Sequence, residues 1–291
     1  MKLTVFTPTY NRAYILPQLY ESLRSQTSKD FEWLVIDDGS TDNTKNLFDE
    51  WMTTETSFKI RYYLQENGGK HRAINKGVSL TENELFFIVD SDDYLTSNAV
   101  EWILGTYKGI ADDEKFAGLS GIRITTDGKK VGGGDDFGIL DTDAISLRLI
   151  HNIQGDMAEV YKTDILRKYP FLEVPGERFC TEALVWNRIA QKYKLRYIYQ
   201  GIYVCEYLPD GLTARIMRER RRSPIASMTY YAEYSHLKIR KLQCFKGCIN
   251  FWRFTPMRFY KKSVDYGMLI PMSFFAWPLG VAMRLNDTRN L

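Results

Sequence analysis

The sequence predicts an α/β fold with a mixed, mainly parallel sheet and helices on both faces. Over the first hundred residues, short apolar runs alternate with amphipathic stretches, which is typical of βαβ units. A polar motif follows each apolar run, and open α/β sheets bind ligands at that edge. The chain has 291 residues, 44% of them hydrophobic and 26% charged, so it has the length and composition to form a substantial core.

Four apolar runs and three amphipathic stretches predict the elements of the first half. The expected strands are Leu3–Thr7, Trp33–Ile36, Ile60–Leu64 and Leu85–Val89. The expected helices between them are Ile15–Leu23, Thr44–Trp51 and Lys70–Val78. Because parallel strands end at a common edge, the motifs that follow them should meet there.

The pattern changes after residue 93. We expect a helix over 98–107 and then a pair of strands, Leu119–Ile124 and Lys130–Val131, turned at Asp127-Gly128. The glycines at 132–134 predict a mobile loop; a phosphate-binding loop is disfavoured because no lysine or helix start follows at the usual spacing. The remaining expected elements are a helix at Thr181–Gln191, strands at Leu195–Tyr199 and Ile202–Glu206, and one or two basic helices over 216–245.

Charge divides the chain into an acidic body and a basic tail. Residues 215–291 hold 15 Lys and Arg against 4 Asp and Glu, or +11, which leaves 24 against 32, or −8, for residues 1–214. The expected boundary lies between these ranges, with a further division of the body into halves, 1–95 and 96–214. A basic tail suits nucleic acid, an anionic membrane or another polyanion.

Targeting signals and cysteines indicate a protein that stays inside the cell. The apolar run after Met1 is short and meets Pro8, so no signal peptide is expected. The four cysteines form no CxxC pair and are interpreted as reduced thiols. The apolar segment 267–283 is short and contains two prolines, which makes it a poor membrane-spanning helix.

The strongest chemical signal is the acidic motif Asp90-Ser91-Asp92-Asp93, directly after an apolar strand. Neighbouring carboxylates at a strand end repel each other and lose hydration unless a cation compensates. Hard ions such as Mg²⁺ and Mn²⁺ prefer this setting and bridge carboxylates to phosphates. The alternative is a solvated acidic turn ahead of the next helix.

Three other strands also end in polar motifs. Asp37 and Asp38 begin the turn DDGSTD, and their carboxylates are suited to accept hydrogen bonds from a base or a ribose, although Asp42 also suits a helix cap. The first strand ends in PTYNR, which offers hydroxyls, an aromatic ring and a guanidinium for phosphate. The sequence NGGK, residues 67–70, follows the third strand.

In this order, PTYNR, DDGSTD, NGGK and DSDD resemble the family 2 glycosyltransferases with the GT-A fold, over roughly residues 1–207. The resemblance implies a nucleotide-diphospho-sugar transferase whose catalytic domain is 1–214, with 1–95 as its nucleotide-binding half and 96–214 as its acceptor half. It implies a nucleotide site at Thr7, Pro8, Tyr10, Arg12, Asp37, Asp38, Asn67, Gly68, Lys70, Asp90 and Ser91. It also implies an Mg²⁺ or Mn²⁺ site at Asp92 and Asp93, with Asp92 as the first choice for the direct ligand.

One departure concerns the phosphate contacts. Many relatives carry an arginine in an ARN triplet after the glycines, where this chain has Ala73-Ile74-Asn75. Lys70, His71 and Arg72 are the candidate replacements, and Lys70 is preferred.

The resemblance also implies a general base in the second half. Glu182 stands where inverting members carry an acidic pair at a helix start, and here the pair reads Glu-Ala. Favourable placement of a carboxylate at a helix amino terminus is the alternative explanation. Asp156, in the block GDMAE, would accept hydrogen bonds from sugar hydroxyls.

The expected activity is inverting transfer of a hexosyl or N-acetylhexosaminyl group from a UDP-sugar to a lipid-linked saccharide in bacterial surface polysaccharide synthesis. The alternatives are a nucleotidyltransferase and a catalytically silent sugar-nucleotide or polyanion binder. In the tail, aromatic residues alternate with cations, which favours a peripheral position on the inner face of the cell membrane over nucleic-acid binding. A basic helix pair packed on the body is the remaining interpretation.

Overall fold

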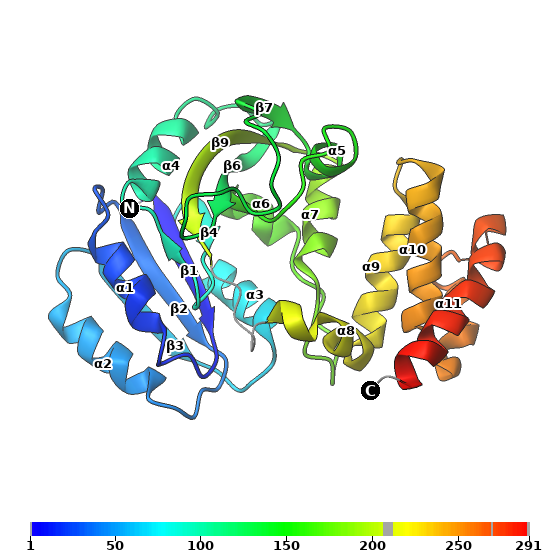
Figure 1. Cartoon of the computed structure of the whole chain (residues 1–291). Coiled ribbons are helices and arrows are strands. Elements are labelled where there is room, and N and C mark those ends of the chain that lie inside the picture. The colour runs from blue at the N-terminus through cyan, green and yellow to red at the C-terminus, as the bar shows by residue number, and fades with distance from the viewer. Residues whose placement is uncertain (1, 206–211, 269, 290–291) are drawn as a thin grey trace. The chain divides into compact units, whose positions relative to one another are not determined.

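The structure is a computed structural model that describes residues 2–205, 212–268 and 270–289 (Figure 1). The chain forms two compact units. Unit 1 comprises Met1–Pro170 and Arg188–Leu208, and unit 2 comprises Phe171–Asn187 and Pro209–Leu291. Residues 171–187 thus group with the C-terminal helices. The end of the catalytic domain at residue 214 stays a prediction.

A nine-stranded mixed sheet forms the centre of unit 1 and confirms the predicted α/β fold class. Its order is β3-β2-β1-β4-β8-β6-β9-β5, and β7 pairs with β9. The four strands β3, β2, β1 and β4 are parallel, while β8 runs antiparallel to β4 and β6. The strands are β1 Leu3–Thr9, β2 Phe31–Asp37, β3 Lys59–Leu64, β4 Leu85–Ile88, β5 Tyr94–Leu95, β6 Phe116–Ile124, β7 Ile139–Thr142, β8 Met157–Lys162 and β9 Lys194–Val204.

Helices cover both faces of this sheet, as expected (Figure 1). Val5 and alternate residues of the neighbouring strands join a core with the apolar sides of α1 and α2. Phe6 points to the other face, where α3 approaches so closely that a Cβ at Gly77 would overlap the Phe6 ring. The helices of unit 1 are α1 Leu16–Arg24, α2 Thr44–Thr54, α3 Lys70–Leu80, α4 Ala99–Tyr107, α5 Ala144–Leu149 and α6 Thr163–Lys168.

The second half of the sheet differs from the sequence prediction. The two strands predicted on either side of residues 200 and 201 are one strand, β9, whose pairing with β6 is irregular near Gly201. Lys130 makes only an isolated bridge to Ile124 instead of a strand pair. The sequence analysis also missed β7, α5, β8 and α6, because these elements have only four to six residues each and carry little periodic signal.

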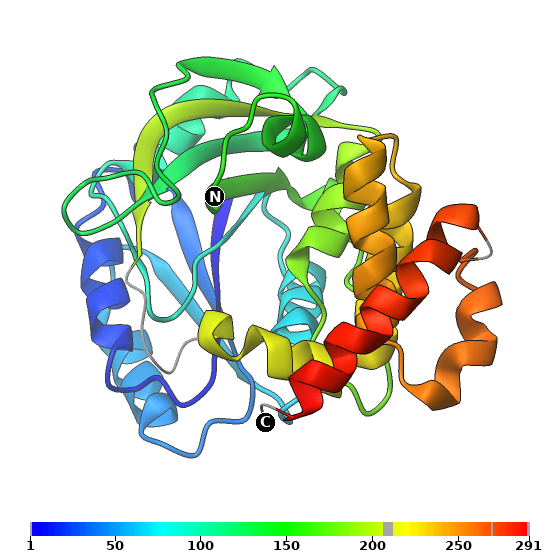
Figure 2. The ribbon, with the colours of Figure 1, turned by 45° about the vertical axis from the view of Figure 1, so that its right-hand side comes forward.

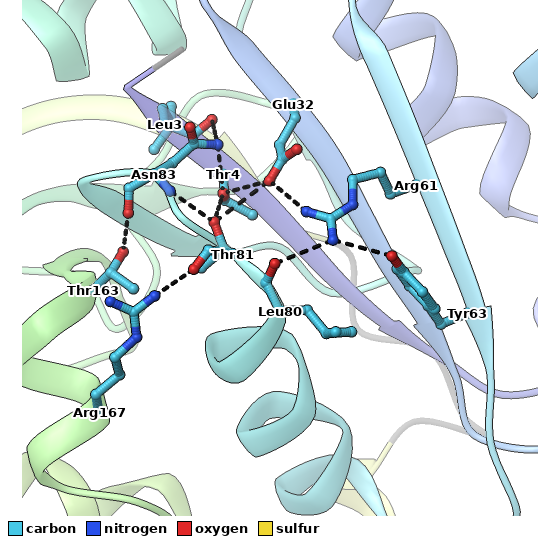
Figure 3. Close-up of polar contacts among 10 residues, drawn as sticks. All are labelled: Leu3, Thr4, Glu32, Arg61, Tyr63, Leu80, Thr81, Asn83, Thr163 and Arg167. Atoms are coloured by element: carbon cyan, nitrogen blue, oxygen red, sulfur yellow. Dashed lines mark hydrogen bonds and ion pairs between the residues drawn. The ribbon is translucent and has the colours of Figure 1, made fainter.

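A buried polar network joins the amino-terminal ends of the strands, at the edge opposite the sequence motifs (Figure 3). Glu32 of β2 accepts hydrogen bonds from the Thr4 hydroxyl at 3.1 Å and from Arg61 at 3.3 Å. Arg61 also donates to Tyr63 and to the Leu80 carbonyl. These partners satisfy the buried carboxylate of Glu32, so this network has a structural role.

Unit 2 is helical, and its two chain segments are held together by hydrogen bonds. Glu177 accepts from the backbone N–H groups of Ile225 and Ala226, at 2.7 and 2.9 Å, and so caps the first turn of α9. The Phe179 N–H donates to the Ser223 hydroxyl at 3.1 Å. The helical elements are α7 Glu182–Ala190, whose last residues belong to unit 1, then α8 Leu212–Arg222, α9 Pro224–His236, α10 Lys241–Phe254, the 3₁₀ helix η1 Met257–Val264 and α11 Pro271–Arg289.

The region predicted as one or two basic helices contains α8, α9 and the start of α10. Pro224 begins α9 at a position that a proline tolerates, which separates it from α8. Within the described ranges, none of the helices combines the length and the hydropathy needed to cross a membrane.

Candidate functional site

The loops after β1 and β2 bind each other at the carboxyl edge of the sheet. The Asn11 N–H donates to the Ser40 hydroxyl at 2.8 Å, and the Asn11 side chain accepts from the Thr41 N–H at 2.8 Å. Asp42 accepts from the Ala13 N–H at 3.0 Å and from the Thr44 N–H and hydroxyl, so it caps the start of α2 as predicted. The first two motifs therefore form one surface.

Asp38 connects this surface to the loop after β3. Its carboxylate accepts from the N–H groups of Gly68 and Gly69, at 2.8 and 2.7 Å, and from the Gln65 side chain. Asn67 donates to the Asp38 carbonyl at 2.8 Å. A buried carboxylate thus fixes the NGGK loop, which is a positioning role that the sequence analysis did not assign to it.

The Asp37 carboxylate also accepts hydrogen bonds from within the protein. It accepts from the Ser40 N–H at 2.7 Å and from the Tyr62 hydroxyl at 2.6 Å. Burial, followed by the hydrogen bond to Asp37, raises the pKa of Tyr62 far above its ordinary value, so the phenol stays protonated and keeps donating. Gly39, at φ +88°, allows the turn to pass close to Asn67.

The residues of the first motif divide into buried and exposed groups. Thr7 and Pro8 lie in the buried strand β1, and the Thr7 hydroxyl accepts from the Trp33 indole at 3.0 Å. Tyr10, by contrast, is 49% exposed. The structure adds Thr9, whose buried hydroxyl at the end of β1 has no hydrogen-bond partner within the described residues.

Two basic side chains hold Asp90 in its charged form. Lys70, the first residue of α3, lies 2.6 Å from Asp90, and Arg123 of β6 lies 3.8 Å from it. Burial alone would raise the pKa of Asp90, but the charges of Lys70 and Arg123 outweigh that effect and place it below the ordinary value. The preference for Lys70 as the phosphate-binding cation that replaces the missing arginine stays a prediction.

Asp93 is anchored from β9. The Tyr203 hydroxyl donates to its carboxylate at 2.6 Å and accepts from the Asp90 N–H at 3.0 Å. Burial and the nearby charge of Asp90 raise the pKa of Asp93 to about 7. Asp93 was a predicted metal ligand, and the structure gives its carboxylate a direct protein partner.

Asp92 differs from Asp90 and Asp93 because its ion pair, with Arg12, is long. Its carboxylate lies 3.7 Å from the Arg12 guanidinium. Burial and the charge of Asp90 raise its pKa, so an added cation would stabilise its charged form. Ser91, between the acidic residues, is buried. The described parts of the chain contain no group of three or more His, Cys, Asp or Glu side chains placed to hold a metal ion.

Arg123 is the site residue that sequence reasoning missed. Its guanidinium lies 4.2 Å from the centre of the Tyr203 ring, 3.7 Å from Asp93 and beside Asp90. Its Nε donates to the Met157 carbonyl at 3.0 Å, which fixes its direction. It lies in an unremarkable strand about 30 residues beyond the acidic motif, and no local pattern marks it.

Asp156 is the chain neighbour of Met157, the residue that Arg123 contacts. Asp156 is exposed. Gly155, at φ +86°, packs against the backbone of Gly132, which leaves no room for a Cβ at either position. Close backbone packing therefore accounts for one glycine of the 132–134 loop.

Glu159 supplies a stability test for this part of the site. Burial raises its pKa to about 7 from 4.5, and the charges of Arg148 and Arg123 offset this only in part. The folded protein therefore keeps a proton that the unfolded chain releases above pH 4.5, and stability falls as pH rises from there to about 7. We expect Glu159→Gln to be more stable than the unsubstituted protein at pH 8, by about 3 kcal/mol, with a much smaller difference at pH 5. Urea unfolding at both pH values measures this, and an equal difference at both would contradict it.

Glu182 begins α7, as the sequence predicted, and belongs to unit 2. The acidic cluster belongs to unit 1. The assignment of Glu182 as the general base stays a prediction.

The parallel strands β3-β2-β1-β4, with four polar loops at their carboxyl edge, belong to a mixed α/β fold of the GT-A class. Over residues 4–118 the sequence matches the family model described as Glycosyl transferase family 2. This match confirms, for that part of the chain, the family that the motifs predicted.

Known proteins give the same assignment over different lengths. A GalNAc(5)-diNAcBac-PP-undecaprenol beta-1,3-glucosyltransferase of Campylobacter jejuni is 27% identical over 274 residues, or 92% of this chain and 83% of that protein. Three other bacterial relatives match over 100 to 122 residues, and the matches span only 15 to 33% of their length. Two of these three are the glycosyltransferases GlyG and GlyA of Streptococcus pneumoniae, and the third is a teichoic acid poly(glycerol phosphate) polymerase of Staphylococcus epidermidis.

Solved structures support the fold. Staphylococcus aureus TarS 1-349, in complex with UDP-GlcNAc, is similar with a TM-score of 0.66 and 16% identity, over 96% of this chain and 79% of that one. The mannosyltransferase PcManGT of Pyrobaculum calidifontis, in complex with GDP-Man and Mn²⁺, has a TM-score of 0.56 and 19% identity, over 99% and 75%. At these identities the likeness concerns the fold alone.

Proposed function

We propose that the protein is a metal-dependent, inverting glycosyltransferase that moves a hexosyl or N-acetylhexosaminyl group from a UDP-sugar to a lipid-linked saccharide. The observation that carries the proposal is the group of cations around the acidic motif. Lys70, Arg12 and Arg123 each lie within 4 Å of one of its carboxylates. Such a mixed cluster is suited to a ligand that brings both negative phosphates and a divalent ion.

The nucleotide would lie along the edge formed by the first three loops. Tyr10 offers an exposed ring for the base, and the backbone around Gly68 is held in place by Asp38. Asp37, Asp38 and Asp90 remain the proposed contacts for base and ribose, since a carboxylate oxygen with one hydrogen bond can accept a second. The sequence assigned Thr7 to the pocket; we now assign it a packing role beneath the pocket floor.

Asp92 is the residue that would hold Mg²⁺ or Mn²⁺, together with oxygens of the donor diphosphate. Sites of this kind use one or two carboxylates plus substrate phosphates, so they do not need a cage made of protein alone. When bound, the ion would neutralise the charge of the leaving diphosphate. The Mn²⁺ complex of the mannosyltransferase supports the choice of metal.

Glu182 would take the proton from the acceptor hydroxyl as that oxygen attacks the anomeric carbon. It is the first residue of α7, and the amino-terminal end of a helix is a favourable place for a carboxylate. Asp156, exposed beside the Arg123 contact, would bind sugar hydroxyls and is the next candidate for the base.

The lipid-linked acceptor rests on the undecaprenol-linked substrate in the name of the Campylobacter relative. It also rests on the basic tail, which would place the enzyme on the cytoplasmic face of an anionic membrane. A nucleotidyltransferase would explain the strand-end carboxylates but not the match to the glycosyltransferase family.

A panel of nucleotide sugars tests the donor. We expect a UDP-sugar to raise the melting temperature more than the corresponding GDP-sugar, and to raise it further with Mn²⁺, because a ligand that binds only the folded state stabilises it. Release of UDP in the presence of Mn²⁺ separates an active transferase from a silent binder. Stabilisation by none of the nucleotide sugars would contradict the proposed function.

A further inference from the structure

Helix α11 contacts the rest of unit 2 through its small residues. Ser273, Ala276 and Gly280 are buried and lie on one side of the helix at spacings of three and four residues. The Ser273 hydroxyl accepts from the Trp252 indole at 2.9 Å. A Cβ at Gly280 would overlap the backbone of α10, so the two helices are in close contact (Figure 2).

Ion pairs fix the far end of the same side. Asp287 accepts two hydrogen bonds from Arg253 of α10, at 2.7 and 2.8 Å. Arg221 of α8 lies 2.7 Å from the same carboxylate. The inner side of α11 therefore contacts α10 and α8 from Ser273 to Asp287. The opposite side faces away from these helices.

That outward side carries the large apolar residues. Phe274 is 64% exposed and Phe275 is 75% exposed, in a helix whose inner side is made of Ser, Ala and Gly. This is the reverse of an ordinary surface helix, which buries its large apolar side chains. We call this set the outer α11 surface: Phe274, Phe275, Trp277, Leu279 and Leu285.

Exposed cations lie on the neighbouring element. Arg258, Lys261 and Lys262 of η1 are all exposed, and the aromatic residues of η1 pack on the same apolar cluster as Ala276 of α11. Asp265, just after η1, is the one exposed acid of this segment. The element thus carries a net positive charge and shares an apolar cluster with α11.

We infer that the outer α11 surface lies in the interfacial layer of an anionic lipid bilayer, with η1 against the headgroups. An apolar helix face binds at the boundary between headgroups and acyl chains, and adjacent cations add attraction to anionic lipid. The inference deepens the proposed function, since it names the surface through which the enzyme would reach a lipid-linked acceptor.

A second copy of the chain fits this surface less well. A two-fold dimer brings the same patch of both copies together, so the cations of η1 would face their own copies. An anionic bilayer offers the opposite charge. Charge complementarity therefore favours lipid over self-association.

Point substitutions test this better than removal of residues 251–291. Phe251 and Trp252 are buried in the core of unit 2, so truncation there would expose that core. We expect the double variant Phe274→Ser/Phe275→Ser to lower binding to phosphatidylglycerol-containing vesicles by about tenfold or more. The triple variant Arg258→Gln/Lys261→Gln/Lys262→Gln should lower it by up to about a hundredfold at low salt, since each cation near an anionic surface is worth roughly fivefold.

The matched control removes exposed apolar side chains from unit 1. Ile139 and Ile150 are 67% and 73% exposed, and Ile139→Ser/Ile150→Ser should leave vesicle binding unchanged. Vesicle flotation at low and high salt measures binding, and sedimentation without lipid measures the oligomeric state. If the Phe variant binds vesicles as strongly as the control and the unsubstituted protein do, the inference is overturned. It is also overturned if the unsubstituted protein binds no lipid and the Phe substitutions only change a dimer to a monomer. UDP release by the soluble enzyme tests the proposed function separately, because it needs no vesicle.

Discussion

Asp92→Asn is expected to lose most glycosyl transfer, by roughly a hundredfold or more, while the protein stays folded. The substitution keeps the shape of the side chain and removes the charge that would hold the metal, so the barrier for departure of the diphosphate rises. Because burial and Asp90 already raise the pKa of Asp92, loss of its charge should not destabilise the folded state. Turnover with saturating Mn²⁺ and the urea midpoint are the two measurements.

Donor binding provides a readout apart from activity. Titration calorimetry with UDP-sugar should show that Mn²⁺ strengthens binding to the unsubstituted protein but not to Asp92→Asn. Asp127→Asn is the control, because Asp127 lies in an exposed turn of the same unit and pairs with Lys129. If Asp92→Asn transfers sugar at the normal rate, with its metal dependence intact, the metal assignment is wrong.

Local patterns predicted the parts of the fold that local interactions define. β1, α1, β2, α2, β3 and α3 all lie within a few residues of their predicted ranges, because each has a clear apolar period. The strand β9 was predicted as two strands separated by Gln200-Gly201. In the sheet, Gly201 instead gives room to Ile124 of the neighbouring strand, a contact that no local pattern contains.

The same distinction applies to the candidate site. Motifs at strand ends identified Lys70, Asp90 and Asp92, because parallel topology brings strand ends together. The bonds from Asp38 to the glycine loop join residues about 30 positions apart, and the carboxylate could equally have faced a ligand. Arg123 could not be predicted from local patterns. It belongs to the candidate site only because strand pairing places β6 near the acidic motif.

Unit 2 depends on long-range contacts as well. The sequence assigned residues 171–187 to the catalytic domain because the family resemblance extends to about residue 207 and the basic tail begins at residue 215. In the structure, Glu177 caps α9 about 48 positions later in the chain, which groups this segment with the C-terminal helices. Charge composition located the basic tail, but it contained no information on this hydrogen bond.

Glu182→Gln is expected to keep donor affinity and to lower turnover by roughly a hundredfold or more, since general-base catalysis is typically worth that much. The amide retains the size of the side chain but has no basic oxygen to take the proton. Loss of a negative charge from the first turn of α7 should cost stability by only about 0.3–1 kcal/mol, so the fold survives. Single-turnover transfer and calorimetric donor binding separate the two effects. Asp156→Asn, measured alongside, decides between the candidates: a normal rate for Glu182→Gln together with a large loss for Asp156→Asn would move the role of the base to Asp156.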